Sequence, residues 1–369
     1  MKVDVAIIGA GPAGGMAACK LARTGMKVLL LEGQTLPRHK PCGGAMPASV
    51  RDLFDWDISP MLEAEVSGQK VLYNYMQPVT VKETSSSILM VDRSRFDFHL
   101  VERAVVLGNG NIVLRDNFRV ARIEETAQGV MALGAQGECI HADFLIGADG
   151  AFGHTAQHLT LNQGHMQGLA IDTEVEVTSS VFEQERPFAT FNFFCIPHGY
   201  GWIFPKNGLL SCGVGAWQGR PQLKRYMDDF LDQSFPAGTI RTVKSYGHII
   251  PLYTQHRQIA TRRTCLVGDA ASLADPIMGE GIRFALLSGA LAAEVLATDT
   301  DDLRAYQQKI HAGIGQNHQN LYQVAAQIFY CAPEFYYRKF VLGGLHSAFL
   351  SSEVMKRKES MTLAPNGYS

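Results

Sequence analysis

The amino-acid sequence predicts an α/β fold, α+β overall, with a parallel sheet, a second antiparallel sheet and a helical C-terminal region. Three observations lead to this prediction. A strand–helix–strand pattern occupies residues 3–32, short β-rich segments occupy residues 117–149 and 169–217, and the chain beyond residue 301 is mostly helical in pattern. The composition, 46% hydrophobic and 18% charged over 369 residues, is that of a globular protein.

The first 32 residues predict one βαβ unit. Residues 3–8 form a β-branched apolar run, which is typical of a strand buried on both faces of a parallel sheet. Residues 16–23 read as a helix that ends near Gly25, and residues 27–32 read as the second strand. About 30 residues is the usual length of such a unit.

The remaining elements follow from similar patterns. Short strands joined by polar turns are expected first, and longer apolar segments follow. The predicted strands are residues 119–123, 130–133, 139–146, 169–177, 189–194, 199–205, 209–217 and 264–268. A helix is expected to begin at residues 92–97 and another is expected at residues 282–296, with further helix to about residue 358.

Charge and cysteine content exclude several classes of protein. The 33 Lys and Arg nearly balance the 35 Asp and Glu, for a net charge of −2, which argues against a protein held mainly by nucleic-acid phosphates. The seven cysteines are odd in number and contain no C-x-x-C pair, so we expect neither a disulfide framework nor a metal site. No signal peptide or transmembrane helix is expected, and the predicted location is cytoplasmic.

A glycine-rich turn follows the first strand and predicts dinucleotide binding. Gly9 permits the tight turn, Gly11 lets the backbone approach a pyrophosphate, and Gly14 lets helix and strand pack closely. Glu32 ends the second strand, where a carboxylate can accept hydrogen bonds from a ribose. The alternative is a structural turn with a solvated Glu32.

Two later turns each place an aspartate at the end of an apolar strand. Asp149 lies in G-A-D-G at residues 147–150, and Asp269 lies in G-D-A-A at residues 268–271. Ligands of open α/β sheets bind at this end of the strands. Residues 279–282 then lead into a helix, whose N–H groups suit an electron-rich ligand. Taken singly, each aspartate is also compatible with a simple helix N-cap.

Together these turns resemble the FAD-binding flavoprotein superfamily that includes para-hydroxybenzoate hydroxylase. The resemblance implies that the first turn holds the ADP half of FAD. It also implies that Asp149 lies near the pyrophosphate, that Asp269 contacts the ribityl–pyrophosphate region, and that residues 279–282 lie near the isoalloxazine. The predicted FAD-binding domain comprises residues 1–68, 92–162 and 260–300. A substrate domain of residues 69–91 and 163–259 and a helical region of residues 301–369 complete the chain.

Three further motifs resemble the geranylgeranyl reductase family. Residues 37–44 read P-R-H-K-P-C-G-G, residues 93–97 read R-S-R-F-D, and residues 200–205 read Y-G-W-I-F-P, followed by G-V-G at residues 213–215. The family matches these as P-x-x-K-x-C-G-G, R-x-x-F-D and Y-x-W-x-F-P with G-x-G. The resemblance implies reduction of C=C bonds in polyprenyl chains by FAD and an external donor, either NAD(P)H or a ferredoxin-like protein.

An aromatic row is the expected substrate wall. Tyr200, Trp202 and Phe204 point to one face of a strand because side chains two residues apart share a face. Burial at roughly 25 cal/mol per Å² would hold an isoprenoid-like chain with few hydrogen bonds. The same row is also compatible with ordinary sheet core. The predicted substrate-binding residues are Tyr200, Trp202, Phe204, Pro205, Gly213 and Gly215.

The resemblance places Cys42 beside the flavin, and we hypothesise that it acts in gating or proton delivery. A buried free cysteine is also compatible with an inert packing role. Arg93 is a further expected FAD contact. The predicted cofactor-binding residues are Gly9, Gly11, Ala13, Gly14, Glu32, Cys42, Gly43, Gly44, Arg93, Asp149, Asp269, Gly279, Gly281 and Ile282.

Other functions stay open from the sequence alone. An FAD monooxygenase of aromatic or polycyclic substrates is the main alternative, and a non-catalytic FAD-binding or electron-relay protein is another. A flavin-dependent halogenase is a third, although Tyr200 and Phe204 replace two members of its W-x-W-x-I-P motif. Aromatic and basic residues between 329 and 358 suggest either weak peripheral membrane contact or a helix packed over the substrate domain.

Overall fold

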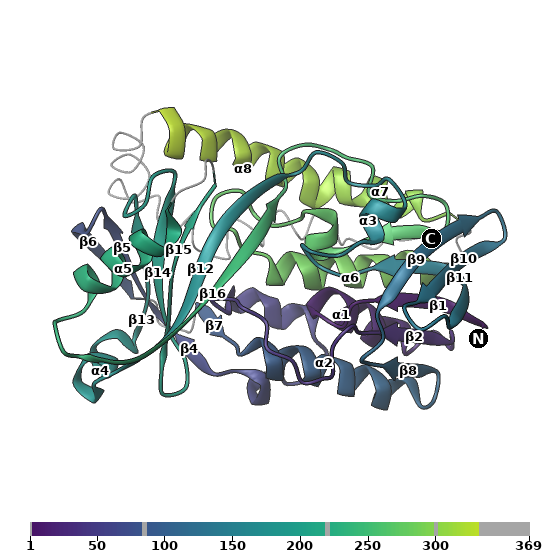
Figure 1. Cartoon of the computed structure of the whole chain (residues 1–369), viewed down its shortest axis with the longest axis horizontal. Helices are drawn as coiled ribbons and strands as arrows, with labels where there is room; N and C mark the ends of the chain where they lie inside the picture. Colours follow the sequence, from purple (N-terminus) through teal and green to yellow (C-terminus); the bar gives the residue numbers. More distant parts are fainter. Residues whose placement is uncertain (1, 83–86, 218–221, 299–301, 332–369) are drawn as a thin grey trace, which may run out of the picture. The chain divides into compact units, whose positions relative to one another are not determined.

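A computed structural model describes residues 2–82, 87–217, 222–298 and 302–331 (Figure 1). The chain divides into two compact units. The first unit comprises Met1–Lys40, Arg93–Gly168 and Ile249–Tyr322, and the second comprises Pro41–Asp92, Leu169–His248 and Gln323–Ser369. Residues 41–68, which the sequence analysis groups with the FAD-binding domain, therefore lie in the second unit.

The first unit contains a seven-stranded mixed sheet. Its order is β8 (Ile112–Arg115), β2 (Val28–Leu31), β1 (Lys2–Ile8), β11 (Cys139–Gly147), β10 (Gly129–Gly134) and β9 (Val120–Thr126), with β17 (Thr264–Leu266) also paired to β11. Strands β8, β2, β1, β11 and β17 are parallel neighbours, whereas β9, β10 and β11 form an antiparallel meander. The predicted α/β class is confirmed, and β11 belongs to both arrangements.

Helix α1 (Pro12–Leu21) packs against α2 (Arg93–Gly108) and α6 (Ile282–Ala297). It begins four residues before the predicted residue 16, because the fixed φ of Pro12 suits the first helical turn. Small residues bring the helices together. A Cβ on Gly15 would lie 2.8 Å from the Cβ of Leu100, and a Cβ on Gly289 would lie 2.1 Å from the Ala13 carbonyl oxygen.

The second unit is built on another seven-stranded sheet. Its order is β16 (Ile240–Leu252), β12 (Met166–Val177), β15 (Leu210–Ala216), β14 (Gly199–Pro205), β13 (Phe188–Phe193), β5 (Gly68–Tyr73) and β6 (Met76–Lys82). A three-stranded sheet of β3 (Ala45–Pro47), β7 (Ile88–Met90) and β4 (Ala64–Val66) accompanies it. Strand β14 has the predicted bounds, because large side chains recur at every second residue and no helical spacing of apolar residues overlaps them.

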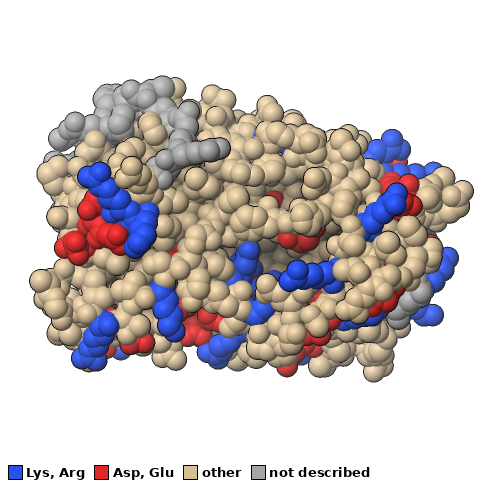
Figure 2. Space-filling model, viewed as in Figure 1, with Lys and Arg blue, Asp and Glu red and all other residues tan. Residues whose placement is uncertain are grey.

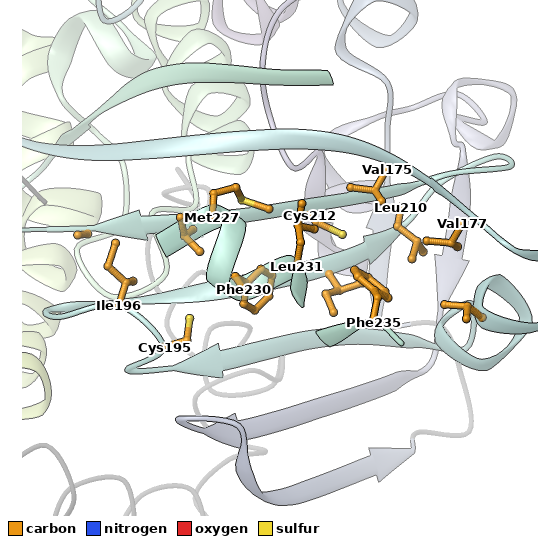
Figure 3. Packing of buried hydrophobic residues seen from close by; sticks show 14 residues of the cluster. Val175, Val177, Cys195, Ile196, Leu210, Cys212, Met227, Phe230, Leu231 and Phe235 are labelled. Atoms are coloured by element: carbon orange, nitrogen blue, oxygen red, sulfur yellow. The ribbon is translucent and has the colours of Figure 1, made fainter. Parts of the chain in front are cut away.

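Helix α5 (Leu223–Ser234) covers one face of this second sheet but not the other. It places Met227, Phe230 and Leu231 on the covered face, where they join a buried cluster with Cys212 and Val214 (Figure 3). Residues of β14 alternate, so Ile203 faces this cluster while Tyr200, Trp202 and Phe204 face the opposite side. The aromatic row is therefore on the face that α5 does not cover.

The other helices are short or lie toward the C-terminus. They are α3 (Thr155–His158), α4 (Ser179–Glu185), α7 (Arg304–Ile310) and α8 (Gln316–Ala326), with π-helical segments at His311–Gly315 and Gln327–Cys331. The prediction of helix beyond residue 301 is confirmed as far as residue 331. The part of the predicted membrane-contacting tail beyond that residue lies outside the described residues.

Charged side chains of both signs are dispersed over the face drawn in Figure 2. This dispersion agrees with the near-zero net charge. Within the described part of the chain, no helix combines the length and apolar character needed to cross a bilayer.

His318 of α8 is a buried polar residue in the core of the first unit. Its Nε2–H donates to the Leu273 carbonyl at 3.2 Å, and its ring stands edge-on to Phe284 with centroids 4.3 Å apart. Within the described residues, Nδ1 is buried without a hydrogen-bond partner. Burial, with a smaller contribution from the Arg283 charge, lowers the pKa of His318 to about 4, although Asp275 and the Leu273 hydrogen bond act in the opposite direction.

We expect acid to destabilise the protein through His318. The unfolded imidazole has a pKa of about 6.5, so between pH 6.5 and 4 the unfolded state binds the proton and the folded state excludes it. The free energy of unfolding should fall by up to about 3 kcal/mol as the pH drops through this window. In His318→Gln this component should be missing. Urea unfolding at several pH values measures it, and identical pH slopes for both proteins would contradict the assignment.

Candidate functional site

The turn between β1 and α1 has three glycines in three different environments. Gly9 has a φ of +103°, and a Cβ there would lie 2.2 Å from the Ala148 carbonyl oxygen. A Cβ on Gly14 would lie 1.9 Å from the Gly9 carbonyl oxygen. At Gly11, by contrast, the nearest atoms are guanidinium nitrogens of Arg38 and Arg93, both 3.7 Å away. Backbone packing thus requires Gly9 and Gly14, while a Cβ on Gly11 would make only ordinary van der Waals contacts, with two cations.

A buried carboxylate fixes those two cations. Asp97, one turn along α2 from Arg93, is fully buried and accepts from Arg93 Nε at 2.8 Å and from Arg38 Nη1 at 3.1 Å. Arg38 Nε also lies 3.2 Å from Glu32 Oε2. Arg93 Nη2 donates to the second Asp97 oxygen at 2.9 Å, so both guanidinium groups are preorganised beside the turn.

Glu32 is oriented toward the turn by the backbone. The Ala10 N–H donates to its Oε2 at 3.1 Å, and the Gln34 N–H donates to its Oε1 at 3.1 Å. A carboxylate has about four lone-pair positions, so capacity remains for a ribose hydroxyl. Ala13, also predicted as a cofactor contact, is buried where α1 meets Gly268 and Gly289.

The two predicted aspartates have different surroundings. Asp149 accepts from both the N–H and the hydroxyl of Thr155, at 2.9 and 2.8 Å, and so caps the short helix α3. Its Oδ1 is buried and has no hydrogen-bond partner among the described residues. Asp269 follows β17, and a Cβ on Gly281 would lie 3.3 Å from its Oδ1. Burial raises the pKa of Asp269, and the charges of Lys40 and Arg93 oppose that effect.

The loop before α6 is held by Asp275, which the sequence analysis did not select. Its buried Oδ1 accepts from the N–H groups of Ile277 and Met278, at 2.9 and 2.6 Å. Gly279 has a φ of +64°, and Gly281 is the N-cap residue of the helix that starts at Ile282. The first unit thus contains 11 of the predicted cofactor residues: Gly9, Gly11, Ala13, Gly14, Glu32, Arg93, Asp149, Asp269, Gly279, Gly281 and Ile282.

The remaining predicted cofactor residues, Cys42, Gly43 and Gly44, lie in the second unit. Gly44 has a φ of +78°, and its N–H donates to the half-buried Cys42 thiol at 3.4 Å. A Cβ on Gly43 would lie 3.1 Å from both Trp202 Nε1 and Phe204 Cδ2. The loop of residues 42–44 is therefore in contact with the aromatic row of β14.

The aromatic row extends across the neighbouring strand. Phe191 and Phe193 of β13 lie opposite Trp202 and Tyr200 of β14, respectively. The Phe193 and Tyr200 ring centroids are 5.4 Å apart. The Trp202 and Phe204 rings are stacked with centroids 6.3 Å apart. The buried aromatic face thus consists of Phe191, Phe193, Tyr200, Trp202 and Phe204.

Gly213 and Gly215 of β15 lie beneath the Trp202 indole. A Cβ on Gly213 would lie 2.0 Å from Trp202 Cζ2, whereas one on Gly215 would lie 3.6 Å from Cζ3. Gly213 therefore has a packing role that Gly215 does not share. Substrate contact by either glycine stays a prediction, as does that of Pro205, which pairs with Leu210 at the end of β14 and β15.

The sequence analysis also missed Arg38, Asp97 and Lys206. Arg38 and Asp97 belong to motifs that it quoted, and the i, i+4 spacing of Arg93 and Asp97 on a predicted helix is a signal for their ion pair. Lys206 directly follows the Y-x-W-x-F-P motif, and its Nζ donates to the Cys42 carbonyl at 3.2 Å. No local pattern indicated that contact, because 164 residues separate the partners.

Gly11→Ala should weaken FAD binding without unfolding the protein. The added methyl group has room in the apoprotein but occupies space that a pyrophosphate needs, so we expect at least about a 10-fold loss of affinity, or about 1.4 kcal/mol. Flavin fluorescence titration measures it. Gly14→Ala is the contrasting variant, expected to lose more than about 2 kcal/mol of unfolding free energy through its backbone clash. Unchanged FAD affinity in Gly11→Ala would contradict the assignment.

Gly213→Ala should strain the aromatic face. We expect a loss of about 1–3 kcal/mol in unfolding free energy, because the new methyl group overlaps the indole. Gly215→Ala should be tolerated, since its methyl group makes only ordinary contacts. A double-mutant cycle with Trp202→Phe, followed by urea unfolding, should recover part of the loss. Absence of that recovery would show that the indole is not the obstacle.

Comparison with known proteins agrees with these features. The family described as FAD binding domain matches residues 2–312. An uncharacterized protein of Methanosarcina barkeri is 32% identical over 325 residues, which cover 85% of this chain and 81% of that protein. A menaquinone reductase of Mycobacterium tuberculosis is 30% identical over 82% of this chain and 78% of its own length. A chloroplastic geranylgeranyl diphosphate reductase of Nicotiana tabacum is 29% identical over 84% and 71%.

Solved structures share the fold. A geranylgeranyl bacteriochlorophyll reductase-like protein of Thermoplasma acidophilum superposes with a TM-score of 0.78 at 22% identity, over 90% of this chain and 89% of that one. A p-nitrophenol 4-monooxygenase of Pseudomonas putida has a TM-score of 0.74 at 18% identity, over 98% of both chains. The glycine turn, the anchored arginines and the family match together lead to one conclusion: the chain belongs to the FAD-binding-domain family of flavoproteins.

Proposed function

We propose that this protein is an FAD-dependent oxidoreductase of geranylgeranyl-reductase type, which saturates C=C bonds of an isoprenoid or polyprenyl lipid. The observation that carries the proposal is the buried aromatic face of β13 and β14, in contact with the loop of residues 42–44. An aromatic, water-poor surface of this kind suits an apolar ligand such as a prenyl chain. Relatives named geranylgeranyl diphosphate reductase and menaquinone reductase, which cover most of the chain, support it.

The residues of the first unit fit FAD. At the N-terminus of α1, a Cβ on Gly11 would make only ordinary contacts with two preorganised guanidinium groups, and Glu32 presents a carboxylate to the same turn. These groups match a pyrophosphate and a ribose in charge and hydrogen-bonding capacity. Asp149 and its unpaired Oδ1, Asp269 and the turn before α6 are the further proposed contacts.

Reduction of a C=C bond adds a hydride to one carbon and a proton to the other. When bound and reduced, FAD supplies the hydride. The aromatic face holds the alkene and excludes water, so that the alkene is bound by burial. Cys42 is proposed to deliver or gate the proton, because its thiol is half-buried in the loop that contacts Trp202 and Phe204. The external electron donor is proposed to be NAD(P)H or a ferredoxin-like protein.

Anaerobic reoxidation of the reduced protein by prenyl lipids tests the proposal. We expect geranylgeranyl compounds to restore the oxidised flavin spectrum, with products heavier by two hydrogens per reduced bond in mass spectrometry. Oxygen consumption coupled to a hydroxylated aromatic product would instead support the monooxygenase alternative, whose fold is shared. A halogenated product would support a halogenase. If no substrate reoxidises the flavin, the non-catalytic reading holds.

Cys42→Ala tests the proton-delivery role separately. We expect turnover to fall by about 100-fold or more, the usual contribution of a positioned acid, while flavin content and substrate affinity change little. Cys139→Ala is the matched control, since Cys139 is also a half-buried free cysteine and lies in the sheet of the first unit. Full turnover by Cys42→Ala would remove the role without affecting the reductase assignment.

A further inference from the structure

Resting on the proposed function, in which Asp269 contacts FAD, we propose that four buried side chains fix the turn that carries Asp269 in the orientation that FAD requires. The turn comprises residues 266–273 and begins at the last residue of β17. The four side chains, which we call the turn clamp, are those of Asn162, Ser288, Tyr306 and His318. They are positioning residues, because each one binds the turn itself.

Asp269 differs from its neighbours in exposure. Residues 264–277 are all buried except Asp269, which is partly exposed. A buried stretch of this kind is ordinarily apolar core, where aspartate is rare. The turn thus leaves one carboxylate accessible to a ligand while the residues on both sides of it are held inside the unit.

The backbone of the turn has an unfavourable conformation. It forms a short 3₁₀ helix at Gly268–Ala271, and a left-handed residue stands at each end, Gly268 with a φ of +58° and Ser272 with a φ of +54°. Few residues other than glycine adopt the left-handed region. Such a backbone persists only where the surrounding structure holds it, so the turn needs support from outside.

Asn162 and Ser288 support the 3₁₀ helix at its two ends. The Asn162 Nδ2 group donates to the Ala270 carbonyl at 2.9 Å and to the Ser272 hydroxyl at 2.7 Å. The Ser288 hydroxyl, on α6, accepts from the Gly268 N–H at 2.9 Å. Both left-handed residues are therefore bonded directly to a side chain of the turn clamp.

Tyr306 and His318 hold the residues that flank the 3₁₀ helix. The fully buried Tyr306 hydroxyl, on α7, donates to the Leu266 carbonyl at 2.9 Å. His318 Nε2–H, on α8, donates to the Leu273 carbonyl at 3.2 Å. The segment after α3 and the helices α6, α7 and α8 thus each contribute one contact residue to the same turn. Apolar residues would fill these positions but would leave buried backbone groups unpaired.

The turn clamp acts on FAD affinity through preorganisation. A turn that already has its bound conformation loses little conformational freedom when a ligand binds. Removal of a clamp contact gives the free protein other conformations of the turn, and FAD binding must then restore the productive one. The orientation of the Asp269 carboxylate, and with it the affinity for FAD, therefore depends on residues far along the chain.

FAD titration of full-length variants tests the proposal. Asn162→Ala removes two hydrogen bonds and should weaken FAD binding about 10-fold, whereas Tyr306→Phe removes one and should weaken it about 3- to 5-fold. Flavin fluorescence measures the Kd, and the melting temperature without FAD shows whether each variant folds. If Asn162→Ala does not fold, Tyr306→Phe, which keeps the ring, takes its place.

A double-mutant cycle separates positioning from general stability. Asp269→Asn alone should weaken FAD binding at least about 10-fold. In the Asn162→Ala background the same substitution should weaken it about 3-fold or less, because the carboxylate is no longer oriented. Ile123→Val is the matched control, since it destabilises a buried core cluster that contains no residue of the turn. It should change neither FAD affinity nor the effect of Asp269→Asn.

The outcomes distinguish the turn clamp from the contact on which it rests. If the clamp variants keep wild-type FAD affinity, or if Asp269→Asn costs the same in the wild type and in Asn162→Ala, the clamp is overturned and the Asp269 contact stands. Unchanged FAD affinity in Asp269→Asn itself overturns the contact and the role of the clamp together. A loss of affinity in Ile123→Val equal to that in Asn162→Ala assigns the effect to stability alone.

Discussion

The close approach of backbone to backbone at the β1–α1 turn is the constraint on which the first unit depends. Gly14 lies against the Gly9 carbonyl, Gly9 lies against the Ala148 carbonyl, and Gly289 lies against the Ala13 carbonyl. Strand β1, the end of β11 and helices α1 and α6 can therefore meet at one point. Of Gly9, Gly11 and Gly14 in this turn, only Gly11 would accept a Cβ without a close contact.

The buried charge of the first unit is paired with opposite charges. Asp97 is fully buried, which would be unfavourable for a lone carboxylate, but it holds two guanidinium groups and one of them reaches Glu32. The network keeps two cations fixed beside the turn before any ligand arrives, so little ordering is required on binding. In the second unit, by contrast, the buried Lys206 ammonium donates to the neutral Cys42 carbonyl.

Much of the first unit was predictable because its signals are local. The βαβ unit, the glycine spacing and the helix starting near Arg93 depend on neighbouring residues and on strand period. The start of α1 was less accurate, since Pro12 permits a helical turn that apolar spacing does not reveal. Packing explains the rest. No local pattern contains the tertiary contacts by which Gly213 accommodates an indole, Asp149 caps α3 and Lys206 meets Cys42.

The interleaving of the two units has a consequence for synthesis on the ribosome. The chain crosses between the units after residues 40, 92, 168, 248 and 322. Strand β17 completes the first sheet only at Leu266, and α1 gains its partner α6 only when Ala297 has been made. The N-terminal turn is therefore synthesised early, but its packing against α6 can form only after that helix has been made. Neither unit is a contiguous piece, so the cofactor-binding face of the nascent protein is complete only after α6 has been made.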